Sequence, residues 1–231
     1  LNNEVTKRKD NGFFDLEKDQ EALKVYLEEI HDKMISFDDE IERLHYLVDN
    51  NFYFNVFEKY SEAELIEITE YAKSIHFQFA SYMSASKFYK DYALKTNDKT
   101  KFLEDYNQHV AIVALYLANG NVKQAKQFIS AMVEQRYQPA TPTFLNAGRA
   151  RRGELVSCFL LEVDDSLNSI NFIDSTAKQL SKIGGGVAIN LSKLRARGEA
   201  IKGIKGVAKG VLPVAKALEG GFSYADQLGQ R

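Results

Sequence analysis

The sequence has few of the residues that cross-link a fold through disulfides or bind metals. Cys158 is the only cysteine among 231 residues, so no disulfide forms within the chain, and the cytoplasm, a reducing compartment, is the expected location. The four histidines, His31, His45, His76 and His109, are scattered, and no pair has the spacing of metal ligands. These scarcities argue against a disulfide-rich secreted domain and against a metal site in this chain.

Long apolar runs and an excess of one charge are also lacking. No stretch of about 18 consecutive apolar residues is present to span a bilayer, and residues 1–8 contain no apolar signal core. The formal net charge is −2, so no overall basic field indicates binding to nucleic acid or to an anionic membrane. With 45% hydrophobic and 27% charged residues, the composition is that of a globular protein with one large or two small domains.

Proline and glycine are scarce in the first part of the chain, which divides the sequence near Gln138. No proline precedes Pro139, and twelve of the fourteen glycines follow it. Residues 1–138 are rich in Glu, Lys, Tyr and Phe, and their apolar side chains recur with a period near 3.6 over residues 15–34 and 102–118. We therefore predict a helical domain for this part.

Capping signals predict where individual helices of this domain begin and end. Ser36-Phe-Asp-Asp39 offers an N-cap with carboxylates in the first turn. Ser61-Glu-Ala-Glu64 is a capping box. Asn119-Gly120 is a helix stop, and Asn121 is a cap for the helix that follows.

Beyond Gln138, short apolar runs of strand length alternate with helical patterns. Residues 155–163 and 187–191 are the two runs, and between them the apolar periodicity predicts a helix over 166–183, capped by either Asp165 or Ser166. A further helix is predicted over 207–220. The order strand, helix, strand, helix indicates parallel pairing and an α/β domain.

The residues that could take part in catalysis or ligand binding lie in this second part. Cys158, in the apolar run 155–163, is by itself typical of a buried and inert core cysteine. Ser157 and Cys158, as neighbours in a strand, are predicted on opposite faces. Thr141-Pro-Thr143 is predicted to be a turn that displays hydroxyl groups.

A second group suggests an anion site. Asp165-Ser-Leu-Asn168 is a polar helix start, where amides favour an anion and a carboxylate can accept from a ribose hydroxyl. Gly184-Gly-Gly186 matches neither the dinucleotide fingerprint nor the P-loop, and fits an ordinary turn equally well. The basic segment Lys193-Leu-Arg-Ala-Arg197, with Lys202 and Lys205, is either a solvated face or a loop that closes on phosphates.

Four segments together closely resemble one family, the large subunit of class I ribonucleoside-diphosphate reductase, specifically its bacterial class Ib branch. They are Thr141-Pro-Thr-Phe-Leu-Asn-Ala-Gly148, Arg151-Arg-Gly-Glu-Leu-Val-Ser-Cys-Phe-Leu-Leu161, Asp165-Ser-Leu-Asn-Ser-Ile170 and Gly184-Gly-Gly-Val-Ala-Ile-Asn-Leu-Ser-Lys-Leu-Arg-Ala-Arg-Gly198. The resemblance implies an N-terminal portion of a longer enzyme. Residues 1–138 would be a helical domain with a reduced ATP-cone remnant at its start, and residues 139–231 the first strands and helices of the ten-stranded reductase α/β barrel.

The resemblance also implies an activity and a set of site residues. In this family a thiyl radical abstracts the 3′ hydrogen of a ribonucleoside diphosphate, and a pair of thiols then reduces the 2′ carbon as water leaves. Cys158 matches the first thiol of that pair, whose partner is not in this chain. Thr141, Ser157 and Gly186 match substrate-binding positions.

A specificity site for nucleoside triphosphates is implied as well. Asp165 and Arg195 match its contacts with the nucleotide, Ser166 and Leu167 lie beside it in the same motif, and Lys202 lies on a loop near the phosphates. The expected effectors are ATP, dATP, dTTP and dGTP, and the chain itself is expected to hold no other cofactor.

Expected partners follow from the same resemblance. The helices over 166–183 and 207–220 match a homodimer contact, and Gln227 and Arg231 match the start of a loop that relays effector identity to the substrate. A small subunit would supply a manganese or iron radical cofactor, and a glutaredoxin-like protein or thioredoxin the reducing electrons. Two other hypotheses are a nucleotide-binding and dimerisation module without catalysis, and a purely helical interaction protein.

Overall fold

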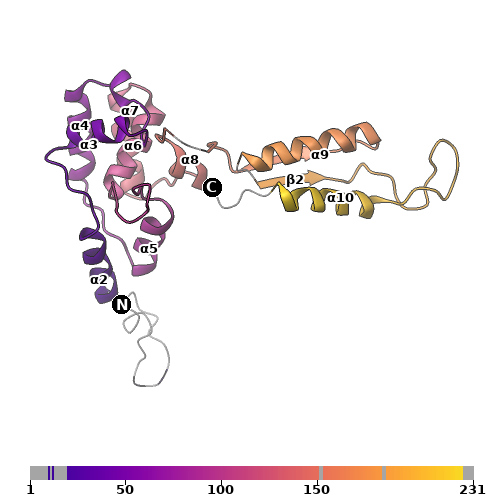
Figure 1. Cartoon of the computed structure of the whole chain (residues 1–231), viewed down its shortest axis with the longest axis horizontal. Coiled ribbons are helices and arrows are strands. Elements are labelled where there is room, and N and C mark those ends of the chain that lie inside the picture. The colour runs from indigo at the N-terminus through magenta and orange to yellow at the C-terminus, as the bar shows by residue number, and fades with distance from the viewer. Residues whose placement is uncertain (1–9, 11, 13–19, 151–152, 184–185, 226–231) are drawn as a thin grey trace. The chain divides into compact units, whose positions relative to one another are not determined.

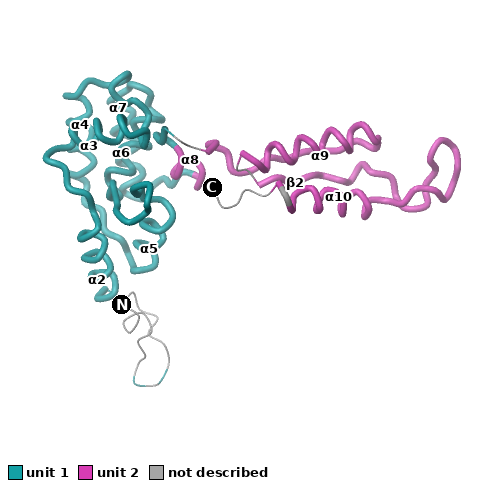
Figure 2. Tube along the Cα trace, in the orientation of Figure 1, with its two compact units in different colours: residues 1–139, 147–151 teal, residues 140–146, 152–231 magenta. Residues whose placement is uncertain are grey.

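A computed structural model describes residues 10, 12, 20–150, 153–183 and 186–225 (Figure 1). The chain divides into two compact units (Figure 2). Unit 1 comprises Leu1–Pro139 and Ala147–Arg151, and unit 2 comprises Ala140–Asn146 and Arg152–Arg231. The predicted relay positions Gln227 and Arg231 and the start of the ATP-cone remnant lie outside the described residues.

Unit 1 is helical in its described part. Its elements are α2 (Gln20–His31), α3 (Glu40–Asp49), the 3-10 helix η1 (Val56–Glu58), α4 (Glu62–Ser74), α5 (Tyr82–Asp91), α6 (Tyr106–Ala118) and α7 (Val122–Val133). Helix α6 is apolar on nearly every side and is buried along most of its length, as expected for the central helix of a bundle. Helices α4 and α7 pack against it.

The predicted caps of α4 and α7 and the predicted stop of α6 are confirmed, and α3 is capped by the last residue of the segment 36–39 rather than by its serine. Asp39 accepts from the Glu42 amide at the start of α3, and Ser61 opens α4 with a capping box. Asn121 caps α7. Asn119 ends α6 in the left-handed conformation with φ 45°, which asparagine tolerates better than most residues.

In unit 1, one predicted helix start was wrong by four residues, and neither α5 nor the short η1 was predicted. The helix expected over 102–118 begins at Tyr106, because Asp105 is its cap and Gln108 completes a capping box. Helix α5 begins at a serine box, in which Ser81 and Ser84 exchange hydrogen bonds. A Ser-x-x-Ser pair is a weaker sequence signal than Ser-x-x-Glu.

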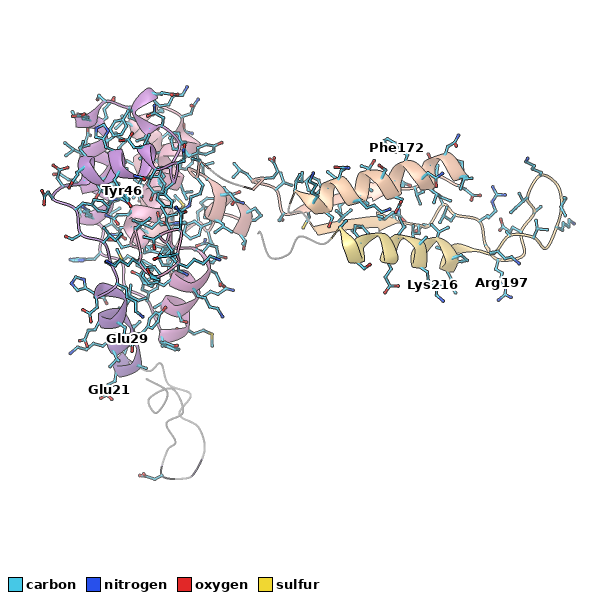
Figure 3. All side chains as sticks on the ribbon, in the orientation of Figure 1. Glu21, Glu29, Tyr46, Phe172, Arg197 and Lys216 are labelled. Carbon is cyan, nitrogen blue, oxygen red and sulfur yellow. The ribbon has the colours of Figure 1, made fainter. Side chains whose placement is uncertain are left out.

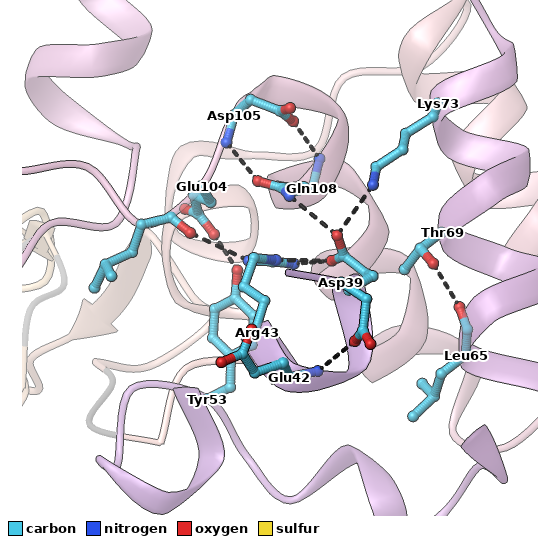
Figure 4. Close-up of polar contacts among 12 residues, drawn as sticks. Asp39, Glu42, Arg43, Tyr53, Leu65, Thr69, Lys73, Glu104, Asp105 and Gln108 are labelled. Atoms are coloured by element: carbon cyan, nitrogen blue, oxygen red, sulfur yellow. Dashed lines mark hydrogen bonds and ion pairs between the residues drawn. The ribbon is translucent and has the colours of Figure 1, made fainter. Parts of the chain in front are cut away.

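A buried carboxylate joins the helices of unit 1 to the segment before α6. The Glu104 side chain is fully buried. It accepts from the hydroxyl of Tyr53 (Figure 4). It also accepts from Arg149 and from the Leu94 amide at 2.8 Å, and lies 2.8 Å from Nδ1 of His109. Burial alone would raise the pKa of Glu104, but the charge of Arg149 and these hydrogen bonds more than reverse this, so the pKa lies well below its usual range.

A second ion pair balances the charge of this network. Arg43 is buried, pairs with Glu40 and donates to the Leu103 carbonyl at 3.2 Å. The guanidinium carbons of Arg43 and Arg149 lie 5.8 and 5.5 Å from the Tyr53 ring centroid. Two carboxylates thus face two guanidinium groups around one aromatic ring, so the burial of charge is compensated.

Unit 2 is built on a strand–helix–strand motif. It contains α8 (Thr141–Asn146), β1 (Cys158–Glu162), α9 (Leu167–Lys182), β2 (Gly186–Asn190) and α10 (Val211–Tyr224). The two strands pair in parallel with Cys158 opposite Gly186 and Glu162 opposite Asn190, which confirms the predicted parallel pairing. Helix α9 packs on both strands and α10 packs on α9. The described chain is therefore a helical domain followed by the start of a mixed α/β domain.

The boundaries of unit 2 differ from prediction in two places. Strand β1 is shorter than the apolar run 155–163, because β2 offers pairing partners only from Cys158 to Glu162. Helix α10 begins at Val211 rather than 207, since Gly210 before it has φ 78°.

Among the described residues, no helix combines the length and apolar character needed to cross a membrane.

The buried carboxylate gives a stability prediction. Glu104→Gln should lower the free energy of unfolding by about 3–5 kcal/mol, because it leaves Arg149 buried without its ionic partner. Urea unfolding followed by circular dichroism measures this. Because the folded pKa of Glu104 is depressed, its contribution is present above its unfolded pKa of about 4.3 and is lost as the pH falls below that value.

Glu67→Gln is the matched control. It removes the same charge from an exposed ion pair with Lys126, so its effect should stay within about 1 kcal/mol. Equal losses in the two variants would contradict a special role for Glu104.

Candidate functional site

Three of the predicted substrate residues meet at the amino ends of β1 and β2. Cys158 and Gly186 are register partners, and the Gly186 amide donates to the Ser157 carbonyl at 2.8 Å. A Cβ added at Gly186 would meet only the Ser157 carbonyl oxygen, at an ordinary 3.6 Å. Strand pairing alone therefore does not require glycine there, and its small size leaves open space beside the thiol.

The thiol of Cys158 is exposed, so the burial that its apolar run indicates by itself is not found. Ser157 Oγ donates to the Cys158 sulfur at 3.3 Å. The prediction that these neighbours lie on opposite faces was also wrong, because Ser157 precedes β1 and the alternation of strand side chains does not extend to it. The hydroxyl of Ser157 and the thiol of Cys158 therefore converge.

The predicted Thr141–Thr143 turn is instead the start of a short helix, α8. Pro142 occupies its first turn, where a missing amide hydrogen has no cost. Thr143 Oγ1 donates to the Leu155 carbonyl at 3.2 Å, which holds α8 against the residues that lead into β1. Thr141 is the exposed first residue of that helix.

The predicted effector residues lie at the other, carboxyl end of β1. Arg195 Nε donates to an Asp165 carboxylate oxygen at 2.6 Å, and Nη2 donates to the Asp165 carbonyl at 3.4 Å. Nη1 of the same residue donates to the Ala200 carbonyl at 3.1 Å. One guanidinium thus ties the β1–α9 turn to the loop after β2.

The start of α9 completes this end of the unit. Ser166, not Asp165, is the cap, and its hydroxyl accepts from the Ser169 amide at 3.1 Å. Leu167 follows with 71% of its side chain exposed. A capped helix start beside a carboxylate and a guanidinium offers amide donors to an anion and an acceptor to a hydroxyl group.

The loop between β2 and α10 is strongly basic. Lys193 bridges Glu162 at 2.9 Å and Asp164 at 3.0 Å, and these contacts raise its pKa. Four further cations form no ion pair within the described part of the chain: Arg197, Lys202, Lys205 and Lys209. Arg197 projects from the ribbon in Figure 3. Such uncompensated cations attract phosphates.

Lys202 lies apart from the other effector residues in the described contacts. It is exposed and has φ 48°, in a turn closed by reciprocal hydrogen bonds between Ile201 and Ile204. Its link to them is indirect, through the bond between Arg195 and the Ala200 carbonyl.

Several positions that shape these two sites were not predicted. Ser169 Oγ accepts from the Asp164 amide at 2.9 Å, and Asn146 Nδ2 donates to the Glu154 carbonyl at 3.1 Å. Neither bond has a local sequence signal, because side-chain bonds to a turn depend on how the turn folds. Lys193 was predicted as part of the basic segment, but its bridge to Glu162 and Asp164 was not. In the described residues no group of three potential ligands is placed to hold a metal.

Comparison with known proteins covers nearly the whole chain. Three family models match in order: "Ribonucleotide reductase N-terminal" over residues 1–77, "Ribonucleotide reductase, all-alpha domain" over 78–152, and "Ribonucleotide reductase, barrel domain" over 156–231. The break before residue 156 falls just ahead of β1, so the barrel match contains both candidate sites except for α8.

Individual relatives agree with these models. The ribonucleoside-diphosphate reductase subunit alpha of Bacillus subtilis is 53% identical over all of this chain and 33% of its own length. The subunit alpha of Mycoplasma pneumoniae is 45% identical over 94% of this chain and 30% of its own length. The chain thus spans about a third of the relatives that it matches.

A solved structure shows a similar fold. The class Id ribonucleotide reductase alpha subunit of Actinobacillus ureae superposes with a TM-score of 0.51 over 62% of this chain and 25% of its own. Its sequence identity is 22%, so this likeness concerns the fold alone.

The exposure of Cys158 predicts its chemical behaviour. One thiol per chain should react with a chromogenic disulfide reagent in the native state, because the sulfur is accessible without unfolding. Absorbance of the released thiolate measures it, and Cys158→Ser should give no signal. A thiol that reacts only after denaturant is added would show that the residue is buried.

Proposed function

The chain belongs to the ribonucleotide reductase large-subunit family, and from this membership we propose that the protein that carries it reduces ribonucleoside diphosphates to 2′-deoxyribonucleoside diphosphates. The observation that carries the proposal is the pairing of Cys158 with Gly186, with Ser157 Oγ on the sulfur. It supplies an accessible thiol at the start of a paired strand, opposite a residue without a side chain, which suits a thiol that must reach a bound sugar.

The proposed reaction begins with hydrogen abstraction from C3′ by a thiyl radical on another cysteine of the enzyme. The 2′ hydroxyl then leaves as water. Cys158 and a second thiol supply two hydrogen atoms and become a disulfide, and the first cysteine regains its radical when the 3′ hydrogen returns. One ribonucleoside diphosphate and two thiols thus yield one deoxyribonucleoside diphosphate, one disulfide and one water.

Three residues are proposed to hold the substrate around this thiol. Thr141 at the start of α8 and Ser157 before β1 would supply hydroxyl groups to the ribose diphosphate. Gly186 would allow it to approach the backbone closely, since no side chain occupies that position. The bond between Thr143 and Leu155 supports this grouping because it joins α8 to the approach to β1.

The carboxyl end of β1 is proposed to bind the specificity effector, ATP, dATP, dTTP or dGTP. The carboxylate of Asp165 would accept from the sugar hydroxyl, with Ser166 and Leu167 beside the nucleotide, while Arg195 and Lys202 would face the phosphates. The four loop cations that form no ion pair with any other described residue support this role.

Placement on a single strand supports coupling between the two sites. Strand β1 runs from Cys158 to Glu162, so about 13 Å of extended chain separates the thiol from the turn that contains Asp165. A short strand that joins the two sites is a direct route by which an occupied effector site would bias the substrate site.

Partners are proposed on the same basis. Helices α9 and α10 leave Phe172 and Leu212 68% and 71% exposed (Phe172 is labelled in Figure 3), which supports a homodimer contact there. A small subunit with a manganese or iron radical cofactor would start the reaction, and a glutaredoxin-like protein or thioredoxin would reduce the disulfide. We place the protein in the cytoplasm, which keeps such thiols reduced.

Replacing the thiol tests the catalytic proposal. In the full protein that carries this chain, with its small subunit, Cys158→Ser should lower turnover of a ribonucleoside diphosphate by at least about 10³-fold, because one of the two reducing hydrogens is lost. Deoxynucleotide formation with a dithiol reductant measures this. The affinity of Cys158→Ser for dTTP should not change. Undiminished turnover in this variant would contradict the proposed redox role of Cys158.

Effector binding tests the second site. Asp165→Ala should weaken dTTP binding at least about tenfold in equilibrium dialysis, because it removes the acceptor for the sugar and the partner of Arg195. Asp174→Ala, which removes a carboxylate from the middle of α9, is the control and should bind normally. Unchanged affinity in Asp165→Ala would exclude the proposed site.

A further inference from the structure

Three carboxylates follow one another at the end of β1 where the effector is proposed to bind. Glu162 is the last residue of the strand, and Asp164 and Asp165 belong to the turn that leads into α9. The side chains of Glu162 and Asp164 are exposed. Negative charges that face solvent repel phosphate groups, so these carboxylates oppose the binding of a nucleoside triphosphate. Binding there requires positive charge that offsets them.

Two cations from the loop after β2 pair with these carboxylates. Arg195 forms an ion pair with Asp165. The ammonium group of Lys193 lies 2.9 Å from a carboxylate oxygen of Glu162 and 3.0 Å from a carboxylate oxygen of Asp164. Among the described residues no other cation pairs with either of these two carboxylates. A single lysine thus offsets both.

The backbone after β2 brings Lys193 to this position. Parallel pairing sets Asn190, the last residue of β2, opposite Glu162, and the Val163 amide donates to the Asn190 carbonyl at 3.2 Å. The side-chain oxygen of Asn190 accepts from the Ser192 amide at 3.0 Å and closes a turn directly before Lys193. The strand register and this turn together return the lysine to the end of β1.

Asp164 is held through its backbone as well as through its carboxylate. Its amide donates to the Ser169 hydroxyl at 2.9 Å, and its carbonyl accepts from the Ser166 amide at 2.7 Å. The turn cannot move this residue away from the start of α9 without breaking these bonds. Its negative charge therefore stays beside Asp165 and has to be offset in place.

Lys193 differs in this respect from the other cations of the loop. Four of them form no ion pair within the described part of the chain, and their charges are available to phosphates. The two carboxylates raise the pKa of Lys193, so it remains protonated at neutral pH. Its charge is already used inside the unit.

We propose that Lys193 is a positioning residue for the effector site, which holds Glu162 and Asp164 and cancels their charge beside the bound nucleotide. This inference rests on the proposed function, because it concerns the site assigned to Asp165 and Arg195. Lys193 does not bind the phosphates. It acts through the two carboxylates, whose repulsion of the triphosphate it removes.

Removal of the lysine charge tests this proposal in the full protein that carries this chain. Lys193→Gln should weaken dTTP binding about fivefold at low salt relative to the unaltered protein, because two uncompensated carboxylates then repel the triphosphate. The difference should fall below about twofold near 1 M salt, where the Debye length is about 3 Å. Equilibrium dialysis measures both affinities. An equal loss at low and high salt would show that charge is not the cause and would overturn the proposal.

Removing the carboxylates together with the lysine separates charge compensation from a purely structural role. The triple variant Glu162→Gln/Asp164→Asn/Lys193→Gln should bind dTTP within about twofold of the unaltered protein, because no charge is left to offset. Lys193→Arg keeps the charge and should bind equally well. If the triple variant binds as weakly as Lys193→Gln, charge compensation is excluded.

Lys126→Gln is the matched control. Lys126 pairs with Glu67 in unit 1, so the same charge is lost from another ion pair, and dTTP binding should not change. An equal loss in this control would overturn a local role for Lys193. Asp165→Ala distinguishes the two levels of the argument. Unchanged dTTP affinity in Asp165→Ala removes the proposed effector site itself, whereas a loss there with normal binding by Lys193→Gln overturns only the role of Lys193.

Discussion

Unit 1 is organised around a carboxylate that has no contact with water. Glu104 stays ionised because Arg149 and several hydrogen-bond donors surround it, and each donor comes from a different part of the unit. A hydrophobic core can slip between similar packings, but a buried charge with fixed partners cannot, since every alternative leaves an ion unpaired. The network therefore ties the helices of unit 1 to the returning segment 147–150.

In unit 2, the parallel direction of the strand pair decides which residues lie close together. Parallel pairing through a crossover helix puts the amino ends of β1 and β2 together and their carboxyl ends together. Cys158 and Gly186 meet at one end for this reason, and Asp165 and Arg195 meet at the other. A single strand–helix–strand motif thus separates the thiol from the proposed effector site and still joins them by one short strand.

Much of this could be predicted from local patterns. Caps such as Ser61 and Asn121 depend on a few neighbouring residues, and parallel pairing follows from the order of elements. The exposure of Cys158 could not be predicted, because an apolar run predicts burial without saying what covers it. The Glu104–Arg149 pair joins residues 45 apart in the sequence, and no local period marks such a contact. Sequence motifs indicated the candidate site residues, but the hydrogen bonds between those residues could be seen only in the folded structure.

The two-stranded sheet of unit 2 has a consequence for the physical behaviour of the chain. In the described residues, β1 and β2 have only each other as neighbours, so each presents an outer row of amide and carbonyl groups without a ladder partner. Such rows act as templates for any extended segment of suitable register, and pairs of strands are marginally stable until a third strand is added. The edges of β1 and β2 are thus growth points, where further strands of a sheet would add or where copies of the chain would aggregate.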